Sequence, residues 1–282
     1  MSAAAPDFGL LGCDFTSAPT RRKPITLAVG RSERGRVLLQ RVERFESLDA
    51  WAQRLREGGP WVGGFDLPFG LPRELVQALD WPNDWAACMA HYAALPRSAV
   101  REAFAAFCAA RPVGGKFAHR ATDGPAGSSP SMKWVNPPVA FMLHAGVPRL
   151  VEAGVDLPGL HTGDPTRVAL EAYPGLLARS VLGSSSYKSD DRARQTPERL
   201  IARRTLLNAL ENGQAPLLQA AGLRLRLTHA QRDELADDAS GDSLDAVLCL
   251  LKAAWALQRR RAGDVHWGLP DFDPLEGWIV GA

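Results

Sequence analysis

Apolar stretches in the first part of the chain predict three consecutive strands. The run FGLLGCDF, residues 8–15, is apolar up to Asp14 and is followed by the turn-forming TSAPT, which indicates a buried strand and a tight loop. Residues 24–30 and 34–45 are two further apolar-rich stretches, separated by the polar RSER. We expect these three segments to form an antiparallel meander.

A helix and two more strand candidates follow the meander. Residues 47–59 begin with a serine cap, carry apolar residues at helical spacing and end in two glycines, so they predict a helix. Residues 61–68 are a short apolar stretch that ends in Asp66 and is stopped by a proline. Residues 167–175 are the next strand candidate, with Glu171 inside it.

The segment between the last two strand candidates has a different character. Helical pieces in residues 72–160 alternate with the Gly/Ser/Pro-rich stretch 121–138. We interpret this segment as a mostly helical insertion in a single domain, residues 1–282. A loop as long as the one inside it is uncommon in a compact domain unless it has a function.

Two helices are predicted near the C-terminus, after a polar loop at residues 183–192. Residues 196–213 have a threonine cap, a proline at the first helical position and a glycine stop. Residues 243–261 are an apolar helix, and Asp242 and Asp245 stand at its start. This helix ends in three arginines, which suit the negative end of a helix dipole.

The composition is that of a globular chain without membrane spans. Of the 282 residues, 46% are hydrophobic and 23% are charged, which is enough apolar material for a large core. The formal net charge of +2 does not by itself indicate a nucleic-acid binder, although a local basic patch would not be visible in this sum. No apolar run approaches the roughly 20 residues that cross a bilayer.

The N-terminal residues and the cysteines indicate the cellular compartment. The start MSAAAPDFG lacks the basic residues and the apolar stretch of a signal peptide. Cys13, Cys88, Cys108 and Cys249 are scattered without a CxxC pair, and we expect buried free thiols at Cys13 and Cys249 rather than disulfides or a zinc site. These features favour a cytoplasmic protein.

Five acidic residues share a position at the end of an apolar element: Asp14, Asp66, Glu171, Asp242 and Asp245. A carboxylate in such a place is costly to bury unless it is paired, hydrogen-bonded or bound to a cation. Neighbouring strands would bring the first three together, and a helix packed across the strand ends would add the other two, because positions i and i+3 share a face. Mg²⁺ or Mn²⁺ would relieve their repulsion, since both ions prefer oxygen ligands.

The same cluster predicts a reaction. Two such ions roughly 3.5–4 Å apart activate a water and stabilise the leaving oxygen in phosphodiester hydrolysis. In this hypothesis Asp14 binds both ions, and Asp66 and Asp245 complete their ligand shells. Glu171 is a further metal ligand, and either Glu171 or Asp242 orients the attacking water.

Each of these residues also has a structural explanation. Asp242 and Ser243 are good helix caps, and Asp245 gains from the helix dipole. Asp66, before Leu-Pro, suits a turn, and Asp14 suits an Asx-turn with the amides that follow it. The recurrence of acidic residues at buried element ends favours a shared site over five separate explanations.

The chain resembles domain-of-unknown-function family 429, described as predicted nucleases of the RNase H fold. The matching segments occur in the family's order over nearly the whole chain: GCDFTSAP (12–19), GFDLPFGLP (64–72), LEAYPGLLAR (170–179), SYKSD (186–190) and GDSLDAVLCLLKAAWA (241–256). The resemblance implies an α/β, RNase H-like fold. In that fold a mixed five-stranded sheet, with strands one to three antiparallel, is flanked by helices, and here a helical insertion follows the fourth strand.

The resemblance also implies a ligand set. The Holliday-junction resolvase branch of this fold takes its acidic residues from the first strand, the fourth strand and a helical Asp-x-x-Asp pair, which correspond to Asp14, Asp66, Asp242 and Asp245. Position 66 is Asp here where the resolvases have Glu, one methylene longer. Glu171, on the fifth strand, belongs to the family's own pattern rather than to the resolvase pattern.

Three basic residues are candidates for contacts with the phosphates of a nucleic-acid substrate. Lys188 lies in the serine-rich loop after the Glu171 strand, and Arg120 and Lys133 flank the Gly/Ser/Pro-rich loop of the insertion. An ordinary solvated surface position accounts equally well for Lys188, and better for Arg120 and Lys133.

Three functions therefore stand side by side. The first is a metal-dependent nuclease whose nucleic-acid substrate the sequence does not identify. The second is an ATP-dependent phosphotransferase of the actin-like and sugar-kinase group, since DFTSAPT imitates a phosphate loop, although no second phosphate loop follows it. The third is a non-catalytic protein that keeps the acidic cluster to bind a metal or a partner.

Overall fold

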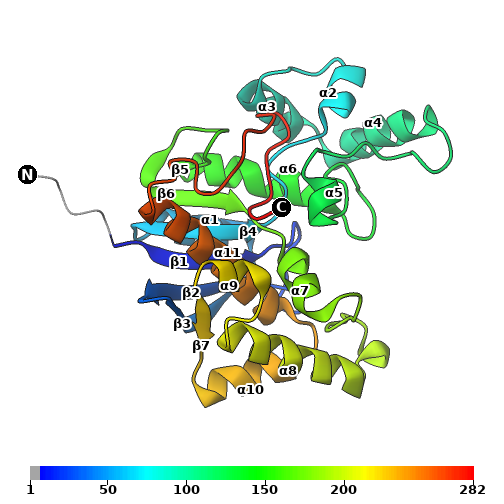
Figure 1. The fold of residues 1–282 in the computed structure, drawn as a ribbon. Helices are drawn as coiled ribbons and strands as arrows, with labels where there is room; N and C mark the ends of the chain where they lie inside the picture. Colours follow the sequence, from blue (N-terminus) through cyan, green and yellow to red (C-terminus); the bar gives the residue numbers. More distant parts are fainter. Residues whose placement is uncertain (1–6) are drawn as a thin grey trace, which may run out of the picture.

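A computed structural model describes residues 7–282 as an α/β fold built on one mixed sheet, with helices packed on both of its faces (Figure 1). Within these residues the sheet has seven strands in the order β5-β6-β4-β1-β2-β3-β7. Their bounds are β1 Gly9–Asp14, β2 Ile25–Glu33, β3 Arg36–Phe45, β4 Trp61–Asp66, β5 Val155–Asp156, β6 Asp164–Glu171 and β7 Arg224–Arg226.

The expected meander is confirmed. β1 pairs antiparallel with β2, and β2 pairs antiparallel with β3. β4 pairs parallel with β1 on its other side, and β6 pairs parallel with β4. The C-terminal ends of β1, β4 and β6, where the apolar runs stop, therefore lie at the same end of the sheet, as parallel pairing requires.

The expected number of strands is wrong, because the sheet described here has seven strands and not five. The two additional strands, β5 and β7, lie at opposite edges of the sheet and are two and three residues long. Segments this short carry no readable alternation of apolar and polar positions, so the sequence pattern does not reveal them.

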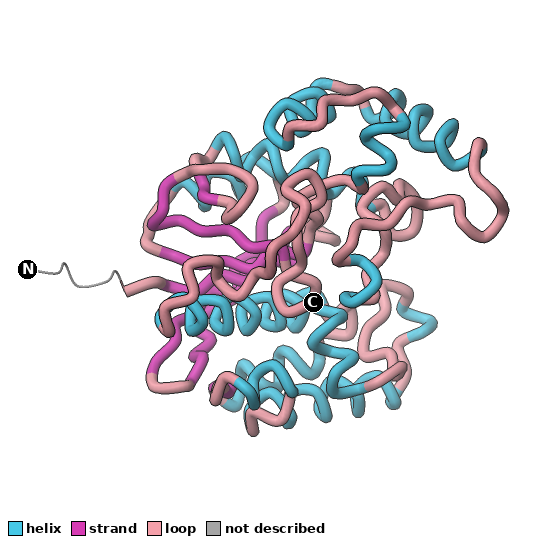
Figure 2. The backbone as a smooth tube through the Cα atoms, turned by 45° about the horizontal axis from the view of Figure 1, so that its top comes forward, coloured by secondary structure: helices cyan, strands magenta, loops and turns pink. Residues whose placement is uncertain are grey.

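The helices α1 to α11 fill the connections between the strands. Their bounds are α1 Leu48–Arg56, α2 Arg73–Ala78, α3 Trp85–Ala94, α4 Arg97–Ala109, α5 Asp123–Ala126, α6 Val139–Glu152, α7 Pro174–Leu182, α8 Pro197–Glu211, α9 Pro216–Ala220, α10 His229–Asp237 and α11 Asp242–Arg261. The helices expected at 47–59, 196–213 and 243–261 are confirmed as α1, α8 and α11. The segment between β4 and β6 contains the helices α2 to α6 and the short β5, so helices are its main regular structure, as expected (Figure 2).

Two apolar cores lie on opposite faces of the sheet. One core contains Trp51 of α1 together with residues of the helical insertion, and the other is centred on α11. From Ser243 to Ala254 every residue of α11 is buried. A helix that is buried on all sides belongs in the interior of a large domain. The burial of a carboxylate in its first turn therefore needs an explanation.

Small residues let α11 cross the sheet at close range. A Cβ atom on Gly12 of β1 would lie 2.1 Å from the carbonyl oxygen of Ala246, and one on Gly64 of β4 would lie 2.4 Å from the carbonyl oxygen of Cys249. Both neighbours are backbone atoms, so only glycine fits at these two points. This close contact places the first turn of α11 over the ends of β1 and β4.

The C-terminal segment packs back onto the domain. Leu275, Ile279 and Val280 are buried, and the amide of Val280 donates a hydrogen bond of 2.9 Å to the carbonyl oxygen of Glu171. The four cysteines are free and buried, which confirms the burial expected for Cys13 and Cys249. Among residues 7–282, the helices are all too short or too polar to span a bilayer.

Candidate functional site

Asp14 and Asp66 are the last residues of two adjacent parallel strands and lie directly opposite each other in the register. Both side chains are half-buried. Within residues 7–282, neither carboxylate accepts a hydrogen bond from a protein group, although nearly all buried polar atoms in proteins have a partner. The strand ends therefore present two neighbouring carboxylates whose oxygens are free for a ligand.

Asp245 joins these two residues from above the sheet. It lies in the first turn of α11 and its side chain is completely buried. Its carboxylate acts electrostatically on both strand-end aspartates, raising the pKa of Asp14 and the pKa of Asp66. The structure thus brings together three of the five acidic residues that the sequence singled out.

The capping explanation for Asp242 is wrong in its detail. The residue at the N-cap of α11 is Gly241, which has a left-handed conformation with φ of 77°, and Asp242 is the first helical residue. The carboxylate that accepts hydrogen bonds from the helix start belongs to Asp238, which receives the amide of Ser243 at 3.0 Å and the hydroxyl of Ser240 at 2.6 Å. Asp242 is therefore not needed as a cap.

Asp242 instead lies at the rim of the cluster. It is half-buried and borders the same cavity as Asp14 and Asp66. Burial raises its pKa, while the ammonium groups of Lys23 and Lys188 act in the opposite direction. Lys23 itself pairs with Asp190 at 2.5 Å.

Two consecutive residues of the loop after α7 bind Asp245. The hydroxyl of Tyr187 donates a hydrogen bond to Oδ1 of Asp245, and the ammonium of Lys188 pairs with Oδ2. Tyr187 is buried, whereas the side chain of Lys188 is 41% exposed. Lys188 therefore brings a positive charge from the cleft to the carboxylates, and the phosphate contact expected for it stays a prediction.

The cluster carries more negative charge than its single ammonium neutralises. Burial, followed by the charge of Asp245, raises the pKa of Asp14 well above its usual value. Burial and Asp245 likewise raise the pKa of Asp66 to about 7. Burial alone would lower the pKa of Lys188, but Asp245 and Asp14 outweigh it and raise that pKa. Near neutral pH this cluster therefore favours an additional cation, either a proton or a metal ion.

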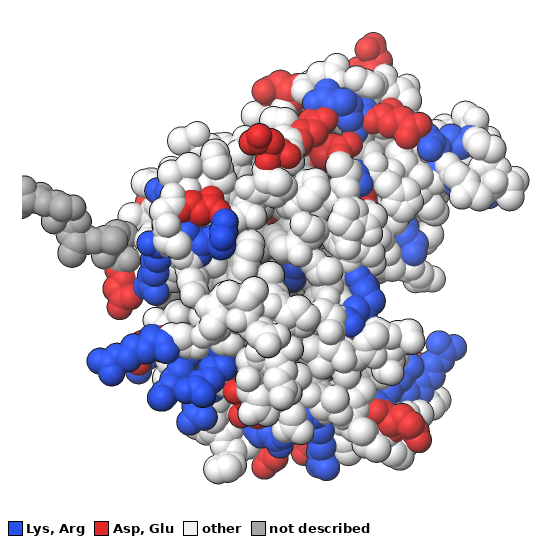
Figure 3. Space-filling model, in the orientation of Figure 1, with Lys and Arg blue, Asp and Glu red and all other residues white. Residues whose placement is uncertain are grey.

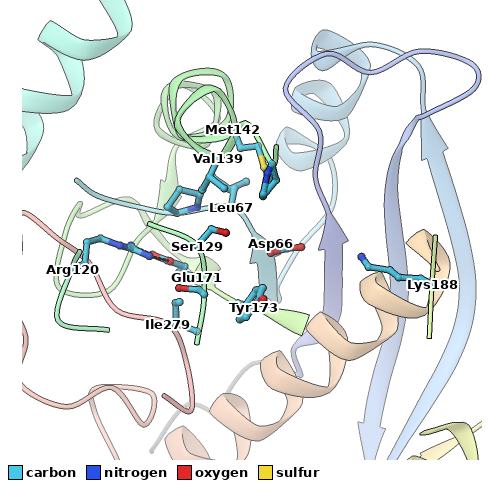
Figure 4. Close-up of a pocket in the computed structure, with 14 residues that line it drawn as sticks. Asp66, Leu67, Arg120, Ser129, Val139, Met142, Glu171, Tyr173, Lys188 and Ile279 are labelled. Atoms are coloured by element: carbon cyan, nitrogen blue, oxygen red, sulfur yellow. Dashed lines mark hydrogen bonds and ion pairs between the residues drawn. The ribbon is translucent and has the colours of Figure 1, made fainter. Parts of the chain in front are cut away.

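Glu171 has a different environment from the three aspartates. Its Oε1 accepts a hydrogen bond of 2.6 Å from Arg120, and its Oε2 accepts bonds of 2.8 Å from Arg120 and 2.9 Å from the amide of Phe69. Both oxygens are thus engaged by the protein. The structure does not place Glu171 among free metal ligands, although it lines the same cavity as Asp66 (Figure 4).

Arg120 is equally occupied. Its guanidinium is buried and donates to Glu171, to Asp123 at 2.9 Å and to the carbonyl oxygen of Glu276 at 3.0 Å. This network joins β6, the insertion and the C-terminal segment, so Arg120 holds these parts together rather than being free for a substrate phosphate. Lys133 stands in the turn before α6, and its amide donates to the carbonyl oxygen of Pro130.

Two cavities open on either side of Asp66 and share four lining residues. The first, about 350 Å³ and called here the Tyr173 cavity, is bordered by Asp66, Ser129, Val139, Met142, Tyr173 and Ile279 (Figure 4). The second, about 320 Å³ and called here the Asp14 cavity, is bordered by Asp14, Thr16, Lys23, Asp66, Asp190 and Asp242. Asp66, Pro137, Met142 and Lys188 border both, so the two cavities are neighbouring parts of one cleft.

The fit of a metal ion depends on Lys188. Among residues 7–282, no group of three or more His, Cys, Asp or Glu side chains is arranged to hold a metal ion. Asp245 is bound by Lys188 and Tyr187, whereas the carboxylates of Asp14, Asp66 and Asp242 accept no hydrogen bond within residues 7–282. Asp14 and Asp66 are the two that lie side by side at the strand ends. Mg²⁺ is commonly held by one or two carboxylates together with water and substrate phosphates, so a two-aspartate site fits its chemistry.

Sequence reasoning missed three contributors to this region: Tyr187, Asp238 and Asp123. Tyr187 precedes Lys188 in the quoted segment SYKSD, but no periodic pattern shows that two consecutive loop residues reach one carboxylate. Asp238 stands three residues before Gly241, a spacing typical of a turn that precedes a helix. Asp123 pairs with Arg120 at i and i+3, a spacing that a sequence can suggest.

Comparison of the chain with protein-family models, with curated protein sequences and with solved structures found no match.

Proposed function

We propose that this chain is a divalent-metal-dependent nuclease whose active centre is the carboxylate cluster of Asp14, Asp66 and Asp245. Mg²⁺ or Mn²⁺ is the proposed cofactor and a nucleic acid the proposed substrate. The observation that carries the proposal is the pair of half-buried aspartates at adjacent strand ends, which lack hydrogen-bond partners within residues 7–282. Their raised pKa values mean that the cluster favours an added positive charge.

The strand arrangement supports an RNase H-like fold for this proposal. β1 to β3 are antiparallel, β4 and β6 run parallel to β1, and a segment with five helices separates β4 from β6. These are the features that the resemblance to family 429 implies, and β5 and β7 extend the sheet at its edges. All five segments of the resemblance contribute residues that border the two cavities at Asp66.

Asp14 and Asp66 are the residues proposed to hold the ion. Both supply hard carboxylate oxygens, which suit Mg²⁺ and Mn²⁺. A bound ion would lower the pKa of a water molecule and neutralise charge on the reacting phosphate. Asp245 becomes a third ligand only where its ion pair with Lys188 is broken.

Lys188 is the proposed phosphate-binding residue. Its ammonium lies where the two cavities meet, and its side chain is on a loop and partly exposed. We expect it to exchange the carboxylate of Asp245 for a phosphate oxygen of the substrate, because an ammonium forms strong charge-assisted bonds with either group. Tyr187 keeps its hydrogen bond to Asp245 and so holds that side chain in place.

One observation favours a second, non-catalytic function. Lys188 already neutralises one charge of the cluster, and an ion pair of this kind also serves purely structural purposes. In that case the cluster would bind neither Mg²⁺ nor Mn²⁺, and the raised pKa values of Asp14 and Asp66 would favour protonation of these side chains instead.

A titration of Mn²⁺ in a thermal melting experiment separates the two functions. If the proposed function is right, added Mn²⁺ raises the melting temperature of the wild type, since a ligand that binds only the folded state stabilises it. The melting temperature of Asp14→Asn rises much less. Asp80→Asn, at an exposed position away from the cluster, is the matched control and responds as the wild type does. An identical response of wild type and Asp14→Asn contradicts the shared metal site. Cleavage of single-stranded, duplex and branched substrates by the same three proteins then tests the reaction.

A further inference from the structure

The Tyr173 cavity has the lining of a pocket for a flat, partly polar ring. Its walls include the buried side chains of Leu67 and Ile279 and the half-buried side chains of Val139 and Met142. Its volume of about 350 Å³ lies at the lower end of the range for small-molecule sites. A cavity of this kind admits one small ring system and excludes a double helix.

Tyr173 is held in a fixed position at this cavity. The guanidinium of Arg179 lies 5.2 Å from the centre of its ring and donates a hydrogen bond of 3.2 Å to its hydroxyl. Arg179 is itself bound to the carbonyl oxygen of Ala126 in the insertion. Gly175 lies under the ring, where a Cβ atom would approach Cζ of Tyr173 to 2.6 Å. An aromatic ring that already has such contacts is a suitable wall for stacking, since ordering it on binding costs little entropy.

One polar group inside the cavity has no partner. The hydroxyl of Ser129, which points toward the middle of the cavity, makes no hydrogen bond within residues 7–282 (Figure 4). The neighbouring Ser128, in contrast, donates to Asp123 at 3.1 Å. A hydroxyl that both donates and accepts suits the mixed donors and acceptors at the edge of a nucleobase.

The position of the cavity relates it to the proposed reaction. The residues that it shares with the Asp14 cavity include Asp66 and Lys188, which carry the charges proposed to act on a phosphate. A nucleotide with its base in the Tyr173 cavity therefore has its phosphate at this junction and the following part of the chain in the Asp14 cavity. The two cavities together accommodate one nucleotide and the start of its neighbour.

The distribution of surface charge does not favour binding of a long duplex. On the face of residues 7–282 drawn in Figure 3, acidic and basic side chains are interspersed, and acidic ones gather over the helical insertion. In the cleft itself Lys188 and Lys23 are the cations at the carboxylates, and each is paired with an aspartate. A protein that tracks many phosphates of a duplex needs a continuous basic surface.

We propose that the Tyr173 cavity binds the base of an unpaired nucleotide, so that the substrate is single-stranded nucleic acid or a nucleotide derivative; this inference rests on the proposed function. A base in a duplex is stacked on both faces and must first be extruded, which costs a few kcal/mol. An unpaired base enters without that cost. The contacts come from stacking on Tyr173 and Met142 and from the hydroxyl of Ser129.

Binding of neutral nucleosides, measured by ligand-observed NMR in the absence of metal, tests the cavity alone. We expect adenosine or cytidine to bind at least about tenfold more tightly than ribose, since base stacking contributes most of the affinity. Val139→Trp fills the cavity and weakens nucleoside binding by about tenfold or more. Met142→Ala removes one wall without adding bulk and weakens it several-fold. Glu152→Trp, at the exposed end of the same helix, is the matched control and binds as the wild type does.

The outcomes separate the base pocket from the nuclease function. Equal binding of nucleosides and ribose, or unchanged binding by both Val139→Trp and Met142→Ala, overturns the base pocket. Hydrolysis of the simple diester bis(4-nitrophenyl) phosphate with Mn²⁺, and its loss in Asp14→Asn, tests the nuclease function without a base. Diester hydrolysis without nucleoside preference refutes the pocket alone. Nucleoside preference without any diester hydrolysis supports the pocket and refutes the nuclease.

Discussion

Lys188 pairs with a carboxylate that has no access to solvent: the side chain of Asp245 is completely buried, whereas that of Lys188 is 41% exposed. The pair therefore connects the interior of the domain with the cleft. The same ammonium is also the compensating charge that acts most strongly on Asp14 and Asp66. Its removal has consequences for both stability and metal binding.

Lys188→Met is expected to lower the free energy of unfolding by about 1–3 kcal/mol at pH 8. A buried charge left without its partner costs about 3–5 kcal/mol, and the partial exposure of Lys188 reduces that figure. Lys23→Met is the matched control, because Lys23 pairs with the exposed Asp190 and its loss costs at most about 1 kcal/mol. Urea unfolding of the two variants measures the difference. Equal losses would mean that the Lys188 pair contributes no more than a surface pair.

Under the proposed function, the same Lys188→Met substitution strengthens Mn²⁺ binding. The ammonium competes with a metal ion for the oxygens of Asp245 and repels the ion at Asp14 and Asp66, so its removal favours the ion. Calorimetric titration with Mn²⁺ is expected to give a dissociation constant several-fold lower than that of the wild type. Lys116→Met, at an exposed position outside both cavities, leaves it nearly unchanged. Weaker binding of Mn²⁺ by Lys188→Met contradicts the assignment of these carboxylates as the metal site.

The sequence pattern predicted the elements of this site better than its contacts. Apolar runs that end in Asp14 and Asp66 identify two buried strands, and parallel pairing is sufficient to bring their ends together. The apolar helix that begins near Asp242 needs a large buried surface, and its place over the sheet follows from Gly12 and Gly64.

The contacts that were not predicted come from segments without periodicity. Glu171 and Arg120 are 51 residues apart and meet because the insertion loop returns to the sheet. Lys188 and Tyr187 approach Asp245 from an irregular loop whose path no hydrophobic pattern determines. Side-chain partners of this kind depend on tertiary structure. From the sequence alone, the same acidic residue can therefore be interpreted equally well as a metal ligand or as one member of an ion pair.

The stability of the protein is expected to fall as the pH rises from about 4 to about 7. The pKa of Asp66 is raised from its usual 3.8 to about 7 in the folded chain, so in this window the folded state binds more protons than the unfolded state. Above pH 7 this contribution levels off. Asp66→Asn removes the titrating group and reduces the slope, which urea unfolding at several pH values measures. Asp80→Asn, at an exposed position, keeps the wild-type slope. A slope unaffected by Asp66→Asn contradicts the raised pKa.

Arg120→Lys is expected to destabilise the protein by about 3 kcal/mol or more and to loosen the insertion and the C-terminal segment. Lysine cannot reproduce the bidentate contact with Glu171 while also binding Asp123 and the carbonyl oxygen of Glu276. Hydrogen exchange is expected to increase at residues 118–130 and 273–280. Arg194→Lys, in an exposed pair with Asp191, serves as the control and changes neither quantity. Unchanged exchange in Arg120→Lys would show that the network does not hold these segments.

Gly12→Ala is expected to unfold or severely destabilise the domain, whereas Gly9→Ala on the same strand is tolerated. The new Cβ atom at position 12 would lie 2.1 Å from the carbonyl oxygen of Ala246 and 2.2 Å from the amide nitrogen of Leu250, and both are backbone atoms of α11. Overpacking of this kind costs about 1–3 kcal/mol when side chains can yield, and more where only the backbone can move. At position 9 the nearest atom is the carbonyl oxygen of Pro60 at 3.6 Å, an ordinary contact. Urea unfolding compares the two variants. Equal stability of the two variants would mean that α11 does not depend on the small residue at position 12.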